Sequence, residues 1–217
     1  MHGELQKTFE FIIELEKLKA VLRKTKPIGL TRAENSAEHS WHVSMVALAV
    51  ASYAKEPVDI GAVIEMLLVH DIPEIDAGDH IIYGGRNEAL ALAEREAAAR
   101  IFGMVPGPLS ERLLGRWLEF EARDTKEAIF AYAVDRLIPV LQNLHNDGQS
   151  WRENGITVDQ VIAVNSAIGL ACPDVWDAVH QMLREAEVGG VFRRVGCEVG
   201  LTMKPPARRS GPTTGLR

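Results

Sequence analysis

The chain has 217 residues, of which 47% are hydrophobic, so it can bury a substantial core as one domain without disulfides or a structural metal. Two cysteines, Cys172 and Cys197, are too few and too far apart for a disulfide framework or a cysteine-rich zinc site, which favours a reducing compartment. The net charge is −6, and the last 31 residues hold six basic and two acidic ones, so residues 1–186 carry −10 and a broad nucleic-acid-binding face is not expected.

Alanine, leucine and glutamate recur with helical spacing from residue 4 to about residue 187, which predicts an all-α fold. The first helix is expected over about 4–24, ending before the helix breakers Pro27 and Gly29. Its apolar side is formed by Phe9, Ile12, Ile13 and Leu18.

The next two helices have recognisable ends. Asn35 and Glu38 resemble a capping box, which predicts a helix over about 36–55. Asp59 is a suitable cap for a third helix over about 59–70. Because Pro73 disfavours the helical conformation of the residue before it, this helix should end at His70 and Asp71.

The remaining helices complete a bundle of about seven to eight. They are predicted over about 87–103, 107–122, 124–145, 157–169 and 173–187, with Asp124 or Thr125 as the cap of the long one. Pro139 should bend that helix beside Asp135. We therefore expect a single domain over residues 1–187, and a loosely ordered basic tail over residues 188–217, which is rich in Gly, Pro and Arg.

Three polar residues, His39, His70 and Asp135, lie on the apolar stripes of three predicted helices. Burying an isolated carboxylate costs several kcal/mol or more, so Asp135 needs a partner or a metal ion. With Asp71, which follows His70, the set offers two imidazoles and two carboxylates to a divalent cation. Taken singly, an inward histidine is more often a hydrogen-bonded core residue, and an inward aspartate is often a cap or an ion-pair partner. The coincidence of three stripes favours the metal site.

Three sequence blocks carry a family resemblance: ENSAEHSWHV, LLVHDIPEIDAGD and YAVDRLIPVLQN. In this order they resemble the HD superfamily of metal-dependent phosphohydrolases, in particular the branch with the bacterial 5′-deoxynucleotidases of the YfbR type and human HD-domain-containing protein 2. The resemblance covers about residues 5–150. It implies an HD-domain helical bundle, commonly dimeric, with one divalent metal ion. The implied metal ligands are His39, His70, Asp71 and Asp135.

The resemblance also implies roles for three further residues. Glu74 corresponds to the residue that positions or deprotonates the attacking water, Asp79 to a residue at the nucleotide sugar, and Arg23 to a phosphate-binding arginine. From spacing alone, Glu74 reads as a solvated loop carboxylate and Arg23 as a cation at a helix end. Family members commonly have a tryptophan shortly after the arginine, whereas the segment LRKTKPIGL has no aromatic residue. His42 is expected to pack beside the metal site without binding the ion.

The function implied is that of a metal-dependent phosphomonoesterase acting on (deoxy)ribonucleoside 5′-monophosphates, with Mn, Co, Mg, Fe, Ni or Zn as the ion. A second hypothesis keeps the metal and changes the substrate to a nucleotide polyphosphate or a cyclic nucleotide. His80 is the one histidine between Asp71 and Asp135, which favours one metal ion over two. A third hypothesis is a non-catalytic sensor of metal or nucleotide.

The expected partners are a small nucleotide and a second copy of the chain, without nucleic acid or membrane. No apolar run reaches membrane-spanning length, and the first residues, MHGELQKTFE, lack the basic-then-apolar order of a secretion signal. We therefore expect a cytoplasmic homodimer.

Overall fold

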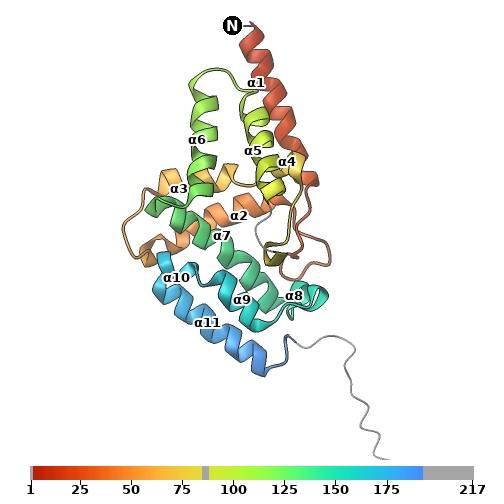
Figure 1. Cartoon of the computed structure of the whole chain (residues 1–217), viewed down its shortest axis with the longest axis vertical. Coiled ribbons are helices and arrows are strands. Elements are labelled where there is room, and N and C mark those ends of the chain that lie inside the picture. Colours follow the sequence, from red (N-terminus) through yellow and green to blue (C-terminus); the bar gives the residue numbers. More distant parts are fainter. Residues whose placement is uncertain (1, 85–87, 193–217) are drawn as a thin grey trace, which may run out of the picture.

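The computed structural model describes residues 2–84 and 88–192. In these ranges the fold is all-α, with α-helices and short 3-10 helices and no β-strand (Figure 1). The eight helices with eight or more residues match the predicted number of seven to eight. They are α1 (His2–Leu15), α2 (Ser36–Val50), α3 (Ile60–Val69), α5 (Glu88–Phe102), α6 (Pro108–Ala122), α7 (Lys126–His145), α9 (Val158–Asn165) and α11 (Pro173–Val188). Shorter segments are α4 (Glu74–Ala77), α8 (Gln149–Asn154), α10 (Ile168–Ala171) and the 3-10 helices η1 (Glu16–Ala20), η2 (Ala51–Tyr53) and η3 (Ile82–Gly84).

Side-chain caps begin three of the helices as predicted. At the start of α2, Asn35 Oδ1 accepts a hydrogen bond from the Glu38 amide at 3.0 Å, and Glu38 Oε1 accepts one from the Asn35 amide at 2.8 Å. Asp59 caps α3 by accepting from two backbone amides. Of the two candidates for α7, Thr125 is the cap.

The first helix is shorter than predicted. α1 ends at Leu15 and η1 at Ala20, and Val21 is already extended, with φ −77° and ψ 116°. The chain then pairs with the residues before α2, since the Arg23 amide donates to the Glu34 carbonyl at 2.8 Å and the Ser36 amide to the Val21 carbonyl at 3.0 Å. Tertiary hydrogen bonds therefore override the helical propensity of this segment and place Arg23 next to the start of α2.

The predicted apolar side of the first helix is wrong for three of its four residues. Leu18 is buried, but Phe9, Ile12 and Ile13 are 55%, 54% and 67% exposed. α1 projects from the bundle and packs against it through Phe11 instead (Figure 1). One apolar face of α1 is therefore left uncovered.

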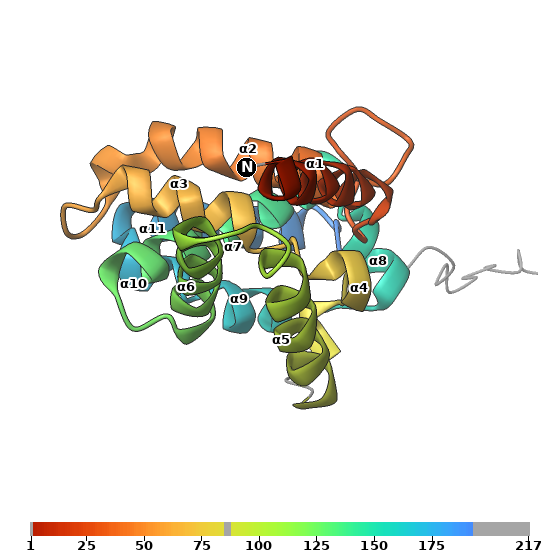
Figure 2. The ribbon, with the colours of Figure 1, turned by 90° about the horizontal axis from the view of Figure 1, so that it is seen from above.

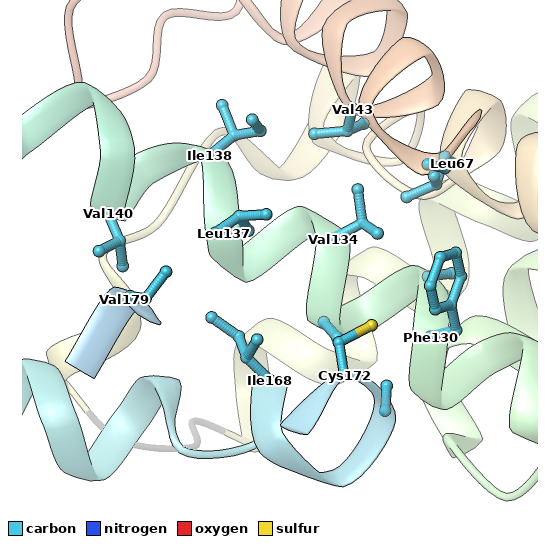
Figure 3. Packing of buried hydrophobic residues seen from close by; sticks show 14 of the residues in the cluster. Val43, Leu67, Phe130, Val134, Leu137, Ile138, Val140, Ile168, Cys172 and Val179 are labelled. Atoms are coloured by element: carbon cyan, nitrogen blue, oxygen red, sulfur yellow. The ribbon is translucent and has the colours of Figure 1, made fainter. Parts of the chain in front are cut away.

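α7 runs through the middle of the larger hydrophobic cluster. Its residues Val134, Leu137 and Ile138 lie between α2 and α3 on one side and α10 and α11 on the other (Figure 3). Val43 and Leu67 approach α7 from the first side. A charged residue on this face of α7 is consequently removed from bulk water.

A second cluster packs α1 and η1 against α5 and α6, and α3 belongs to both clusters. Met66 of α3 lies in the first cluster and Val69 in the second. Figure 2 shows α2 and α3 side by side, with α7 beneath them. The ring of His70, just beyond α3, lies 5.1 Å from Phe120 of α6. His70, at the end of α3, therefore lies between the two hydrophobic clusters.

Part of the predicted tail packs on the fold. Phe192 stacks on Trp151 with ring centroids 4.8 Å apart, and Val191 contacts the larger cluster. Residues 193–217, the rest of that segment, lie outside the described residues. Among the described residues no helix is both long and apolar enough to cross a bilayer.

Candidate metal centre

His39, His70 and Asp135 meet at one buried point. Each offers one ligand atom, and these atoms all lie within 4.8 Å of one another. His39 Nε2 is 3.0 Å and His70 Nε2 is 3.7 Å from Asp135 Oδ1. The three stripes of α2, α3 and α7 thus converge as the sequence predicts. Two imidazoles and a carboxylate are a donor set suited to a first-row divalent ion.

The two histidines are oriented by hydrogen bonds at their other ring nitrogens. His70 Nδ1 donates to the Leu67 carbonyl at 2.8 Å, so Nε2 is the ring nitrogen that faces the cluster. This Nε2 is buried, and no described residue makes a well-aligned hydrogen bond to it, although carboxylate oxygens of Asp71 and Asp135 lie 3.0 and 3.7 Å away. His39 Nδ1 lies 3.2 Å from Glu34 Oε2. Both rings are therefore held as a metal ligand requires, and the unpartnered His70 nitrogen fits a cation at this point.

The charges around the cluster shift two of its ionisation equilibria. Burial disfavours the imidazolium of His70, but Asp71 and Asp135 outweigh burial and raise its pKa to about 9. Burial opposes the charged form of Asp135, yet Arg136, His39 and His70 hold its pKa well below the ordinary value. Asp135 is thus an anion, as a metal ligand must be.

Asp71, the fourth predicted ligand, borders the three others. Its Oδ1 lies 3.0 Å from His70 Nε2, and its Oδ2 accepts a hydrogen bond from Arg23 Nη1 at 2.7 Å. Arg23 thereby fixes the direction of this carboxylate. Its service as a metal ligand stays a prediction, which the geometry beside His70 favours.

Glu74 begins α4 directly after Pro73, one turn beyond His70. Its Oε2 accepts a hydrogen bond from the Ser36 hydroxyl at 2.7 Å, which orients the carboxyl group. Burial raises the pKa of Glu74 to about 8, and the neighbouring Asp71 carboxylate adds to the increase. The residue is half-buried, so the solvated-loop interpretation does not hold.

Asp79 follows a turn that needs glycine. Gly78 has φ 77°, in the left-handed region that side chains disfavour. Asp79 Oδ1 lies 4.0 Å from Arg23 Nη1, and burial raises the pKa of this aspartate. The turn therefore brings Asp79 to the same guanidinium that binds Asp71.

The side chain of Arg23 is only 9% exposed, so Arg23 is not the surface cation of a helix end. Besides Asp71 and Asp79, its guanidinium lies 3.6 Å from Glu34 and 4.0 Å from Asp135. Burial lowers its pKa, but the carboxylates of Asp71, Asp135, Glu74 and Asp79 reverse the effect and raise it. Arg23 consequently neutralises several carboxylates of the site at once.

An open cleft of about 1370 Å³ gives access to the cluster. It is lined by the residues that follow α3 and by parts of α4 to α7, including His70, Asp71, Glu74 and Asp135. A second hollow of about 580 Å³ lies beyond, with an apolar wall that includes Pro139. Both are lined by Arg23, Asp79, His80, Ile81, Ile82 and Arg136. The two hollows therefore adjoin, and the candidate metal ligands His70, Asp71 and Asp135 line the larger one.

Two other histidines, His42 and His80, lie outside the cluster of candidate metal ligands. His42 stacks with Trp41, with ring centroids 6.2 Å apart, and is absent from the described metal cluster. His80 is exposed and lies with Nδ1 2.9 Å from the Gly78 carbonyl.

Glu34, Ser36 and Arg136 are site residues that the sequence does not predict. Glu34 and Ser36 lie in or next to an extended segment, where helical periodicity gives no information. Arg136 follows Asp135 directly and so falls off the apolar stripe of α7. The sequence signal that could have indicated Glu34 and Ser36 is the cluster of charged and hydroxyl residues around the cap of α2.

Glu34 provides a test of ligand orientation. It is 2% exposed and also accepts a hydrogen bond from Gln142 Nε2 at 2.5 Å. Replacing Glu34 with Gln should weaken metal binding by roughly 10- to 100-fold, as for other partners of ligating histidines. Competition with a chelating dye measures the dissociation constant. Glu38→Gln, which changes the exposed ion pair with Arg32, is the control. Equal affinities of wild type and Glu34→Gln would contradict this role.

Comparison with known proteins places this geometry in context. The model of a family described as the HD domain matches residues 15–176. The chain is 39% identical to a predicted metal-dependent phosphohydrolase from Magnetospirillum magnetotacticum MS-1, over 87% of this chain and 97% of that one, with a TM-score of 0.81. Comparison with curated proteins gives no match.

Two archaeal structures share the fold at low identity. The protein PH0347 from Pyrococcus horikoshii OT3 is 20% identical, with 80% of this chain and 99% of that chain covered and a TM-score of 0.59. A conserved hypothetical protein from Pyrococcus furiosus is 16% identical, with coverages of 83% and 99% and a TM-score of 0.55. At these identities the likeness concerns the fold alone.

Proposed function

The chain belongs to the HD-domain family, and we propose that it is a metal-dependent phosphohydrolase that removes the 5′-phosphate from (deoxy)ribonucleoside 5′-monophosphates. The observation that carries the proposal is the convergence of His39, His70 and Asp135 at a buried point that opens into a large cleft. Glu74 and Arg23 line the same cleft. A non-catalytic sensor needs no half-buried carboxyl group beside the metal ligands, whereas a hydrolase does.

The ion would be held by His39, His70 and Asp135, together with Asp71. When bound, it supplies Lewis-acid chemistry, polarising a phosphoryl oxygen and lowering the pKa of water. These ligands are buried, which strengthens the charge interactions between them. Arg23 keeps Asp71 in place through its 2.7 Å hydrogen bond.

Glu74 is the proposed general base. In its ionised form, Glu74 takes a proton from the attacking water as the water oxygen forms a bond to phosphorus. The bond between phosphorus and the 5′ oxygen breaks, and the proton passes to that oxygen to give nucleoside and inorganic phosphate. Ser36 holds Glu74 by Oε2, so the carboxyl group enters the reaction already oriented. Asp79 would accept a hydrogen bond from a sugar hydroxyl.

A panel of phosphate esters tests the substrate class. Metal-stripped protein reloaded with Mn²⁺, Co²⁺ or Mg²⁺ should release phosphate from ribo- and deoxyribonucleoside 5′-monophosphates. The matched 3′-monophosphates and simple sugar phosphates should react at least tenfold more slowly, about 1.4 kcal/mol in transition-state binding. Equal turnover of the 3′ isomers would contradict the proposal that the protein is a 5′-nucleotidase. Faster turnover of a polyphosphate or a cyclic nucleotide would support the second hypothesis instead.

We also propose that two copies of the chain associate through the outer face of α1. Leu5, Phe9, Ile12 and Ile13 are each more than half exposed there. α2, along the same edge of the molecule in Figure 2, exposes Trp41, Met45 and Leu48. Large apolar side chains gathered in this way are typical of a protein interface.

The assembly proposal predicts the effect of one buried charge. Ile13→Glu should convert the dimer into a monomer, because a carboxylate inside an apolar interface loses its hydration without a partner. Light scattering coupled to size-exclusion chromatography measures the mass. Leu170→Glu, at an equally exposed position on α10, should leave it unchanged. A monomeric wild type would contradict the proposal.

A further inference from the structure

Arg136 is a second buried arginine at the metal centre, and the chemistry above does not use it. It is 8% exposed, and its Nη2 lies 3.3 Å from Asp135 Oδ2. Its Nε, like that of Arg23, is buried and has no hydrogen-bond partner among the described residues. A guanidinium carries five N–H donors and needs acceptors when buried, so an orphan Nε leaves binding capacity unused.

The surroundings of Arg136 and Arg23 differ in charge. Arg23 has carboxylate oxygens of Asp71, Glu34, Asp79 and Asp135 within 4.0 Å. For Arg136 the described partner is Asp135 alone, at 3.3 Å. The carboxylates of the site therefore neutralise the charge of Arg23, whereas Asp135 alone offsets that of Arg136 among the described residues.

The position of Arg136 suits a ligand that spans the site. It lines both the large cleft, which His70, Asp71 and Asp135 also line, and the second hollow, so it stands where the two adjoin. Its guanidinium carbon lies 5.6 Å from the ring centroid of Tyr132, one turn earlier on α7, which supports the side chain from one side. An anionic group at the junction of the two hollows would lie against Arg136 and next to Asp135.

The total charge explains why such a cation is needed. Five carboxyl groups, those of Glu34, Asp71, Glu74, Asp79 and Asp135, surround the cluster. A phosphate dianion approaching these groups meets repulsion that a divalent ion and the ion-paired Arg23 must offset together. An additional guanidinium with an unused donor reduces that repulsion and matches the geometry of phosphate oxygens.

We propose that Arg136 binds the phosphoryl group of the substrate and of the phosphate product, and that Arg23 mainly orients the carboxylates of the metal centre. The assignment rests on the proposed phosphohydrolase function and names a further substrate-binding residue for it. Donation from Nε and a terminal nitrogen to two phosphate oxygens would satisfy the orphan group. The ion pair with Asp135 places the bound phosphate beside the metal ligands.

Inorganic phosphate is the probe, because its binding is measurable whether or not nucleotides are hydrolysed. Titration calorimetry on the metal-loaded full-length protein gives the dissociation constant, and elemental analysis gives the metal content. Arg136→Gln should weaken phosphate binding roughly 10- to 100-fold, the range of a charge-assisted hydrogen bond. It should retain its metal and raise KM for a nucleoside monophosphate more than it lowers kcat. Arg116→Gln, at a partly buried arginine paired with Glu65 and Glu119, is the control and should match wild type.

Arg136→Lys keeps a positive charge opposite Asp135 but lacks the forked donors, so it tests the proposal if the glutamine variant fails to fold. It should bind phosphate several-fold more weakly than wild type. Phosphate affinity equal to wild type in either folded variant would overturn the proposal. So would loss of the metal from both variants, because Arg136 would then act through Asp135 alone. Absence of nucleotide turnover with the phosphate effect intact would instead count against the substrate class.

Discussion

Replacing His39 with alanine should leave the purified protein without bound metal and reduce phosphate release to background. The His39 ring is fully buried, with Nε2 3.0 Å from Asp135 and Nδ1 3.2 Å from Glu34. Alanine removes one of the proposed ligand atoms. His70 and Asp135 cannot replace it, because each already offers its own ligand atom. Elemental analysis after loading with Mn²⁺ or Co²⁺ and desalting measures the effect.

His42 supplies the matched control for this experiment. It lies three residues later on α2 but stacks with Trp41 at the surface. His42→Ala should therefore load metal like the wild type. Melting temperatures of the metal-stripped proteins separate a loss of ligand from a loss of fold. Normal metal content in a folded His39→Ala protein would show that the cluster is not the metal centre.

Glu74→Gln should lower turnover by about 10²- to 10⁴-fold, the usual contribution of a general base, while the metal stays bound. The amide keeps the size of the side chain and can still accept the hydrogen bond from Ser36, which is 2.7 Å long in the wild type. It cannot take a proton from water. Steady-state phosphate release and metal content, measured on the same sample, distinguish loss of the base from loss of the ion.

Asp76→Asn is the control on the same short helix. Asp76 is exposed and pairs with Arg100 at 2.6 Å, so the substitution should change turnover by less than a factor of about two. If Glu74→Gln retained wild-type turnover, another residue would be the base. Tight nucleotide binding by Glu74→Gln and Asp71→Ala, with no hydrolysis by wild type, would favour the sensor hypothesis.

The sequence predicted the metal cluster because its signal is local. His39, His70 and Asp135 each interrupt a regular apolar stripe, and such a stripe faces the core wherever the helix packs. The caps at Asn35, Asp59 and Thr125 are local for the same reason. Side-chain chemistry over three or four neighbouring residues suffices for both.

Features that depend on distant partners escaped prediction. Residues 21–24 have adequate helical propensity, but hydrogen bonds between residues 21–25 and 34–36 make this segment extended and bury Arg23. The apolar side of α1 has a clear pattern, yet periodicity does not say what covers it, and Phe9 and Ile13 are exposed. Glu34 is defined as a site residue only by its contact with His39.

Titration of metal into the stripped protein tests the central claim most directly. Phosphate release from a deoxyribonucleoside 5′-monophosphate is followed as Mn²⁺ or Co²⁺ is added in fractions of one equivalent per chain. We expect no release without metal and a rate that rises linearly and saturates at one equivalent, because the proposed ligands His39, His70, Asp71 and Asp135 suffice for one ion. Saturation at two equivalents, or no release with any metal, would contradict a single-ion phosphohydrolase.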